Sequence, residues 1–175
     1  SSPPAFGIYI LIPIITKFLK VYPDISINLQ LNDKNIDIIG EGFDLALRAG
    51  TLKDSSLVAQ HLVTSEDMIV ATKKYYKIHG KPHKPRDLIQ HSFAFYDKGK
   101  NNPQLTLKRK NSEETIEINP ICLTNQIEAI KRLVESDLCL ASLPSIFIQK
   151  DLAQGKLEAC LSDYQLPTNS LYMVY

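Results

Sequence analysis

The segment from Gly40 to Gly50 constrains what this chain can fold into more than any other stretch. It reads GEGFDLALRAG, so a short apolar run stands between glycines, and the polar residues TLKDSS follow it directly. Such a pattern predicts a buried strand that ends in a loop. Because ligands bind outside the carboxyl ends of strands in open α/β sheets, we expect Arg48, Ala49 and Gly50 to lie at a binding edge.

Strands and helices alternate along the first half of the chain. Residues 25–31 alternate strictly between apolar and polar side chains, which is the period of a strand with one buried face. This order is typical of a mostly parallel sheet with helices on both faces. The other elements expected here are a short helix over 35–39, strands over 45–48, 57–63 and 68–72, and a helix over 73–79.

The second half of the chain predicts a further α/β unit. Residues 105–108 and 115–118 are expected to form a hairpin around the polar stretch 108–114. The elements that follow are a helix over about 126–135 capped by Thr124 or Asn125, a buried strand over 138–143, and a helix that Pro144 and Ser145 open and Gly155 ends.

Five segments match the sequence motifs of a known family, and they occur in the same order. They are FLKVYPDI at 18–25, the segment 40–50, PRDLIQH at 85–91, DLAQGKL at 151–157 and LYMVY at 171–175, whereas residues 98–120 read as unfamiliar. Together they resemble the effector-binding domain of LysR-type transcriptional regulators. The resemblance implies an α/β fold of the type 2 periplasmic-binding-protein kind, with two Rossmann-like lobes whose mostly parallel sheets are joined by two crossing strands. Lobe I is expected to comprise residues 1–66 and 167–175, and lobe II residues 67–166, with the crossings near 64–67 and 166–171.

Four loops are candidates for holding a ligand, because helix N-termini present unpaired backbone N–H groups and a positive dipole end. The resemblance places an effector pocket at these loops, in the cleft between the lobes, with Leu143 as an apolar neighbour. The alternative for Thr124 and Asn125 is helix capping, and the alternative for Arg48 is an ion pair with Asp33 or Asp44. The four loops contain Pro4, Ala5 and Phe6; Asn32 and Asp33; Arg48, Ala49 and Gly50; and Thr124 and Asn125.

The expected effector is a small carboxylate or an aromatic acid. Relatives often carry a serine or threonine that contacts ligand at the position of Ala5. In this chain the backbone N–H groups of Ala5 and Phe6 remain as anion contacts, while the Phe6 ring supplies an apolar wall. The residues leave the choice between the two ligand classes open.

Residues 8–15, IYILIPII, are apolar on every face of a helix. A surface helix carries only one apolar stripe, so this helix is expected to be covered on all sides, by a partner chain or by burial within one chain. Pro13 predicts that the helix begins near Ile12 or kinks there. The resemblance implies a homodimer or homotetramer, with contacts made by Ile8, Tyr9, Leu11, Ile12 and Ile15.

The balance of charges argues against DNA binding by this sequence itself. Twenty basic and 19 acidic side chains give a formal net charge of +1, which provides no field to hold a polyanion. The resemblance implies that DNA is bound by a separate N-terminal helix-turn-helix domain outside this sequence. A cytoplasmic location without a membrane is expected, because no apolar run reaches the roughly 20 residues that span a bilayer. The alternative function is a solute-binding protein of a transport system with the same fold.

No enzyme active site, cofactor or metal is expected. The chain has no nucleophile elbow and no phosphate-binding glycine loop, and its histidines lack paired ligand spacing. The three cysteines have apolar neighbours, which is typical of buried free thiols in a reducing compartment, with a redox pair of Cys122 and Cys139 as the alternative. The residues concerned are His61, His79, His83 and His91, and Cys122, Cys139 and Cys160.

Overall fold

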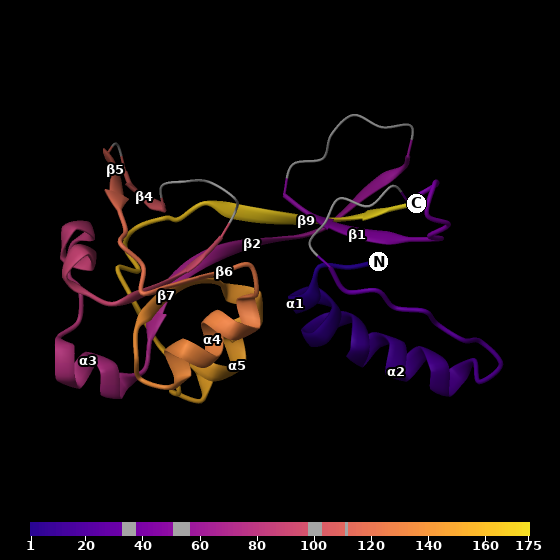
Figure 1. Ribbon diagram of the computed structural model, residues 1–175, viewed down its shortest axis with the longest axis horizontal. Helices are drawn as coiled ribbons and strands as arrows, with labels where there is room; N and C mark the ends of the chain where they lie inside the picture. Colours follow the sequence, from indigo (N-terminus) through magenta and orange to yellow (C-terminus); the bar gives the residue numbers. More distant parts are fainter. Residues whose placement is uncertain (33–37, 51–56, 98–102, 111) are drawn as a thin grey trace. The chain divides into compact units, whose positions relative to one another are not determined.

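The chain divides into two compact units, which Figure 1 shows in a computed structural model. Unit 1 comprises Ser1–Thr64 and Asn169–Tyr175, and unit 2 comprises Ser65–Thr168. The lobe boundaries were predicted at 66/67 and 166/167, and the boundaries between the two units lie at 64/65 and 168/169. The structure describes residues 1–32, 38–50, 57–97, 103–110 and 112–175, and the predicted helix over 35–39 lies largely outside them.

A sheet forms the centre of unit 2. Strand β3 (Phe93–Tyr96) pairs in parallel with β7 (Leu140–Pro144) on one side and with β6 (Cys122–Thr124) on the other. Strand β2 (Ala59–Ala71) pairs antiparallel with β7 and with β8 (Glu158–Cys160). The α/β class is therefore confirmed, and the predicted strands over 57–63 and 68–72 are one strand, because the residues between them stay extended.

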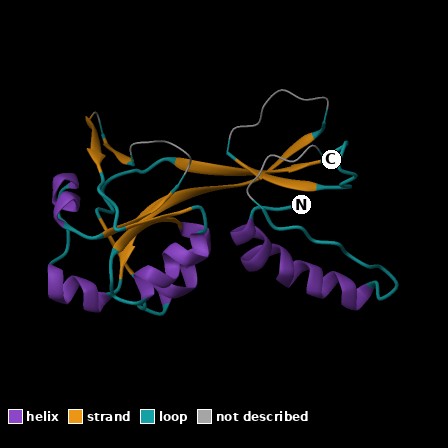
Figure 2. Ribbon diagram, viewed as in Figure 1, coloured by secondary structure: helices purple, strands orange, loops and turns teal. Residues whose placement is uncertain are grey.

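Both faces of this sheet are covered, as Figure 2 shows for its helices. Helices α4 (Ile127–Glu135) and α5 (Ser145–Ala153) bury one face, where Val70 and Ala141 lie in their core. Side chains alternate along a strand, so the neighbouring residues Ile69 and Leu140 point to the opposite face. That second core also contains residues of α3 (Lys73–His79), of the 3₁₀ helix η2 (Pro85–Gln90) and of a hairpin.

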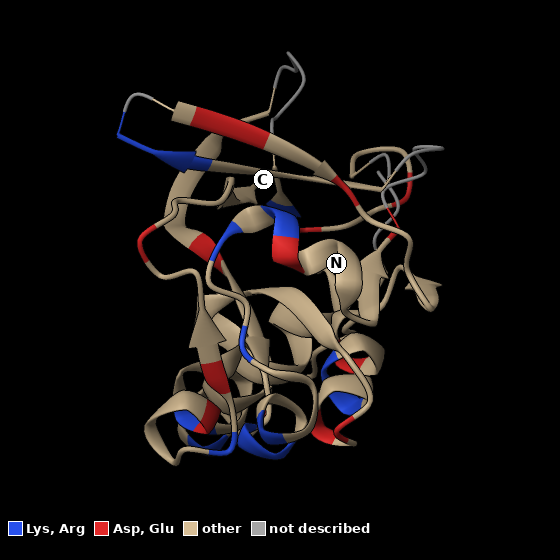
Figure 3. Cartoon of the chain, turned by 90° about the vertical axis from the view of Figure 1, so that its left-hand side faces the viewer, with Lys and Arg blue, Asp and Glu red and all other residues tan. Residues whose placement is uncertain are grey.

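The hairpin consists of β4 (Gln104–Arg109) and β5 (Ser112–Glu117), which confirms the predicted hairpin. Leu105, Leu107 and Ile116 are buried against the second core, so the hairpin is an integral part of unit 2. In Figure 3 basic residues stand at the end of one of its strands and acidic residues along the other. The ammonium of Lys108 lies 2.9 Å from the Glu113 carboxylate, an exposed pair that contributes little.

Unit 1 begins with one helical run built from three segments. They are α1 (Pro4–Phe6), a π-helical turn η1 (Gly7–Leu11) and α2 (Ile12–Val21). The regular α-helix α2 begins at Ile12, as predicted, and the π-helical turn η1 joins it to α1. In the wider turn, the Ile12 N–H donates to the Gly7 carbonyl five residues earlier, directly before Pro13, which has no N–H to donate.

This helix is apolar, and much of it is exposed in the part of the chain that the structure describes. Ala5, Phe6 and Gly7 are buried, whereas α2 has no buried residue there, so coverage by a partner chain stays the prediction for it. By length and composition, the 18 residues Pro4–Val21, with a mean hydropathy of 1.6, are long and apolar enough to cross a membrane. The helix includes Lys17 and Lys20, so the expectation that no uninterrupted apolar run reaches about 20 residues is not contradicted.

The strands of unit 1 are short. Strand β1 (Ala46–Ala49) pairs antiparallel with β9 (Thr168–Val174). The predicted strand over 25–31 is wrong, because only Leu31 makes a bridge, and its partner is Ser2. Ile25 and Ile27 are exposed, so among the described residues the alternating segment has no sheet neighbour against which to bury an apolar face.

Candidate functional site

Three of the four predicted loops follow neighbouring extended segments of unit 1. The Ser2 N–H donates to the Gln30 carbonyl and the Asn32 N–H donates to the Ser2 carbonyl, both at 3.0 Å. On the other side of this segment, the Leu47 N–H donates to the Ser1 carbonyl at 2.8 Å. These bonds have the pattern of parallel strands, whose carboxyl ends meet at one edge. We name this the carboxyl edge of unit 1: Pro4, Ala5 and Phe6, Asn32, and Arg48, Ala49 and Gly50, with Asp33 outside the described residues.

Arg48 is the cationic residue of this edge. Its guanidinium is partly buried, and a side-chain nitrogen lies 3.5 Å from the Leu47 carbonyl. Burial lowers the pKa of Arg48, while the nearby Glu41 carboxylate acts in the opposite direction. Because arginine keeps its charge even when its pKa is lowered, the edge retains a donor suited to carboxylates.

Gly50 turns the chain at the end of β1. Its φ is 91°, in the left-handed region where glycine is favoured, and its N–H donates to the Ser170 carbonyl at 2.9 Å. The turn therefore holds the end of the strand against β9 while leaving no side chain over the edge.

The fourth predicted loop lies in unit 2, at the carboxyl end of β6. Thr124 accepts a hydrogen bond from the Gln126 N–H at 3.2 Å, and its carbonyl accepts one from the Asp97 N–H at 2.9 Å. The N-cap residue of α4 is Gln126, without a side-chain cap, so neither Thr124 nor Asn125 caps this helix as predicted. Asn125 is exposed next to the helix N-terminus.

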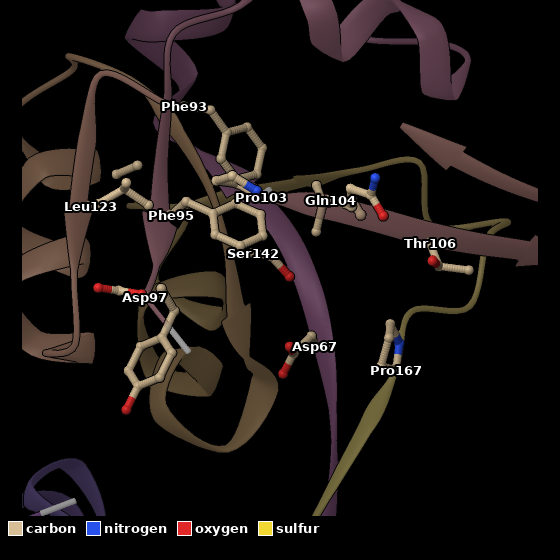
Figure 4. A pocket seen from close by; sticks show the side chains of 13 residues that line it. Asp67, Phe93, Phe95, Asp97, Pro103, Gln104, Thr106, Leu123, Ser142 and Pro167 are labelled. Carbon is tan, nitrogen blue, oxygen red and sulfur yellow. The ribbon is translucent and has the colours of Figure 1, made fainter. Parts of the chain in front are cut away.

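A cavity of about 290 Å³ lies in unit 2 on the sheet face that carries the hairpin. It was not predicted from the sequence, because its walls come from segments far apart in the chain. One of them is part of the stretch 98–120, which does not match the family motifs. Figure 4 shows the side chains of the cavity. The lining residues are Asp67, Phe93, Ala94, Phe95, Tyr96, Asp97, Pro103, Gln104, Leu105, Thr106, Leu123, Ser142 and Pro167.

Alternation along β7 decides which residue reaches this cavity. The predicted site residue Leu143 is fully buried in the core beneath α4 and α5. Its neighbour Ser142 points to the other face and lines the cavity. The Ser142 hydroxyl oxygen is shielded from solvent and has no hydrogen-bond partner among the residues that the structure describes. Because neighbouring residues of a strand point to opposite faces, the choice of Leu143 instead of Ser142 placed the predicted residue on the wrong face of the sheet.

The three cysteines, Cys122, Cys139 and Cys160, are free thiols, and two of them are buried. Burial raises the pKa of the Cys139 thiol to about 11 and also raises the pKa of Cys160, so both remain protonated near neutral pH. Among the described residues, no three histidine, cysteine, aspartate or glutamate side chains come close enough to hold a metal ion.

Two α/β units that share a strand, with loops and a cavity at strand ends, define a ligand-binding domain of the periplasmic-binding-protein-like class. The family model described as the LysR substrate binding domain matches residues 1–175. The chain therefore belongs to this family.

Its relatives carry the names of transcriptional regulators. An HTH-type regulator of Haemophilus influenzae, named as uncharacterized, is 30% identical over 175 residues, which cover 100% of this chain and 61% of that protein. The HTH-type transcriptional regulator CrgA of Neisseria meningitidis is 32% identical over 170 residues, covering 94% of this chain and 56% of CrgA. A solved structure of CrgA superimposes with a TM-score of 0.89 at 27% identity, over 99% of this chain and 59% of that chain. The chain thus spans less than two thirds of these relatives, and their names favour a regulator over a transport protein or an enzyme.

Proposed function

We propose that this chain is the ligand-sensing part of a cytoplasmic transcriptional regulator. The observation that carries the proposal is the match of the LysR substrate binding domain to the whole of residues 1–175. In the complete protein, a separate helix-turn-helix domain binds DNA, and the sensing domain forms a homodimer or homotetramer. A small-molecule effector bound by the sensing domain then changes how the oligomer holds DNA.

The carboxyl edge of unit 1 supports the binding of an anionic effector. Arg48 supplies a positive charge there, and Asn32 and the backbone of Ala5 and Phe6 supply polar groups. Thr124 and Asn125 offer similar groups at the end of β6 in unit 2. We therefore assign effector binding to these residues, together with Pro4, Asp33, Ala49 and Gly50, and leave out Leu143 because its side chain is buried in the core.

The mechanism is a shift between two states of the domain. An effector moves such an equilibrium only if it binds one state more tightly than the other. Moving the population from mostly inactive to mostly active requires a preference of about 5.5 kcal/mol. The effector must therefore be recognised by several groups at once, which suits an edge where three loops meet.

Thermal denaturation of the purified chain with a panel of small carboxylates and aromatic acids tests this proposal. A cognate acid should raise the melting temperature in a saturable way, because it binds only the folded state. Arg48→Gln and Asn125→Ala should weaken that stabilisation. Arg132→Gln is the matched control, because Arg132 is exposed on α4 and pairs with Glu128. Stabilisation that is equal in all three variants would refute the assigned site.

A further inference from the structure

We propose that Thr64 and Ser170 are positioning residues for the carboxyl edge of unit 1. Together with the His61 ring, their hydroxyl groups fix the Gly50 turn to the strands that lead into unit 2. We name the three side chains of His61, Thr64 and Ser170 the strand clasp. This inference rests on the proposed function, because it assigns a means of control to the same binding edge.

The strand clasp is a chain of hydrogen bonds between β2 and β9. The Thr64 hydroxyl oxygen lies 2.9 Å from Nε2 of His61 on its own strand and 2.9 Å from the Ser170 hydroxyl oxygen on β9, 106 positions further along the chain. A hydroxyl group donates one hydrogen bond and also accepts, so Thr64 can bond to both neighbours at once. The His61 ring packs edge-on against the Tyr172 ring, with centroids 5.4 Å apart, and this contact orients Nε2 toward Thr64.

The strand clasp lies where both strands leave unit 1. Thr64 is the last residue of the first segment of unit 1, and the second segment begins at Asn169, one residue before Ser170. At the far end of the same pairing, Val58 and Tyr175 exchange two backbone hydrogen bonds, of 3.0 and 3.2 Å. Backbone groups therefore join the two strands at one end, and the side chains of the clasp join them at the junction with unit 2.

The backbone of Ser170 connects the clasp to the carboxyl edge. Its carbonyl accepts the Gly50 N–H at 2.9 Å, one position beyond the last residue pair of β1 and β9. Because Gly50 has no side chain to pack, backbone bonds such as this one place its turn. Ser170 is thus held by β2 through its hydroxyl and holds the Gly50 turn through its carbonyl. A displacement of β2 at the junction is passed through these contacts to the loop that carries Arg48.

Hydrogen exchange of backbone amides, followed by NMR on the ¹⁵N-labelled chain without effector, tests the proposal. Thr64→Val removes the hydroxyl and keeps the branched shape, whereas Thr64→Ser keeps the hydroxyl. The Gly50 amide should exchange at least about threefold faster in Thr64→Val, because the lost bond eases local opening. Thr64→Ser should keep the wild-type rate. An equal Gly50 rate in wild type and Thr64→Val would overturn the proposal.

Two further readouts separate positioning from general loosening. The Leu140 amide, which is buried and bonds to the Ser92 carbonyl in unit 2, should exchange at the same rate in every variant. The ring nitrogen resonances of His61 should move in Thr64→Val and return in Thr64→Ser, because only a hydroxyl at this position bonds to Nε2. His61 resonances that do not move in Thr64→Val would overturn the chain of bonds on which the proposal depends.

Substitutions on β9 complete the test. Ser170→Ala should accelerate exchange of the Gly50 amide as much as Thr64→Val, and the double variant should be no faster than either, because both remove the same bond. Thr168→Val is the matched control: Thr168 is exposed on the same strand and lies outside the clasp, so it should keep the wild-type rate. Equal acceleration by Thr168→Val, or additive effects in the double variant, would overturn the proposal.

The outcome is distinguishable from a failure of the proposed function, because the exchange measurement needs no effector. If the Gly50 amide responds as expected while no acid stabilises the chain, the strand clasp stands and the effector assignment is wrong. If acids act through Arg48 while the Gly50 amide is insensitive to Thr64→Val, the sensing function stands and the strand clasp is wrong.

Discussion

The ammonium of Lys131 lies 2.7 Å from the carboxylate of Asp151, and the two side chains are only 10% and 12% exposed. Lys131 belongs to α4 and Asp151 to α5, so the pair ties together the helices that cover one face of the unit 2 sheet. The Lys131 ammonium also lies 3.5 Å from the Phe147 carbonyl. A buried pair of this kind is expensive to break, because removal of Asp151 leaves the buried Lys131 ammonium to the more distant Glu135 carboxylate, at 3.9 Å.

Asp151→Ala is therefore expected to destabilise the chain by about 3–5 kcal/mol. The double variant Lys131→Met with Asp151→Leu should recover most of that loss, because it removes both charges and fills the space with apolar atoms. Urea denaturation of the three proteins measures the differences. A single variant as stable as the wild type would show that solvent reaches the pair more freely than its exposure indicates.

The hairpin should be as important for stability as the helices. Leu107 is fully buried in the core that the hairpin shares with α3 and η2, so Leu107→Ala is expected to cost about 2–5 kcal/mol through lost burial and a residual cavity. Thr115→Ala, on the exposed side of the same hairpin, should cost less, up to about 1 kcal/mol, because it loses the cross-strand hydrogen bond between the Thr115 and Thr106 hydroxyls, at 3.1 Å. Thermal denaturation of both variants checks the contrast, and equal effects would mean that the hairpin is only loosely packed.

The sequence predicted elements well where a pattern was long or had clear ends. The helix over 73–79 is present as Lys73–His79, because Thr72 caps it through a hydrogen bond from the Tyr75 N–H and Gly80 follows it. The amphipathic helix over 126–135 and the hairpin around 108–114 were also found. These elements depend on local chemistry, so a local pattern is enough to identify them.

Elements and site residues that depend on partners far along the chain could not be predicted in this way. Strands β3 and β6 are short and show no alternation, and they are strands because each pairs with a neighbour distant in sequence. The strand predicted over 25–31 has the right period and lacks that neighbour. The cavity of unit 2 was missed for the same reason, since Asp67 and Ser142 meet only when β2 pairs with β7.

His91 should make the stability of unit 2 depend on pH. The Tyr75 hydroxyl lies 3.2 Å from a ring nitrogen of His91, and burial lowers the pKa of His91, with nearby His79 acting in the same direction and Asp87 against it. Folding therefore favours the neutral form of His91. The contribution of neutral His91 to stability is full above the ordinary histidine pKa of about 6.5, and it is lost as pH falls below that value, because protonation is then easier in the unfolded chain.

The test compares wild type with His91→Gln between about pH 7.5 and about pH 5. The wild type should lose more stability than the variant as the pH falls, as measured by melting temperature. His83→Gln is the matched control, because His83 is exposed in the neighbouring loop, and it should lose as much as the wild type. Parallel curves for wild type and His91→Gln would contradict the prediction.

Asp137 should contribute stability over a different pH range. Hydrogen bonds from Lys74, at 2.8 Å, and from Thr72 lower the pKa of the Asp137 carboxyl. Its contribution is therefore full above the ordinary carboxyl pKa of about 3.9 and is lost as pH falls through the lowered value. Asp137→Asn should be less stable than wild type near neutral pH, and the difference should shrink in acid. Urea denaturation at several pH values checks this, and a constant difference would exclude the ionised carboxylate as the cause.

The uncovered helix of unit 1 should hold two chains together. Ile8 and Ile12 are exposed in the isolated chain, while Tyr9, Leu11 and Ile15 are partly buried. An apolar surface of this kind on a domain of a regulator family is typical of a protein interface. A second copy of the chain would cover it, because most oligomers of one chain use closed symmetry in which the same surface meets itself or a second patch.

Ile12→Glu is accordingly expected to dissociate the oligomer, since it would bury a charge without a partner at the interface. Sedimentation should show the wild type at roughly twice the chain mass or more and the variant at 19.7 kDa. Ile78→Glu is the matched control: Ile78 is 64% exposed on α3, compared with 44% for Ile12, and its replacement should leave the mass unchanged. Dissociation by both variants would point to general loss of folding, and dissociation by neither would place the interface on another surface. The interface is assigned to this helix only if Ile12→Glu dissociates the oligomer and Ile78→Glu does not.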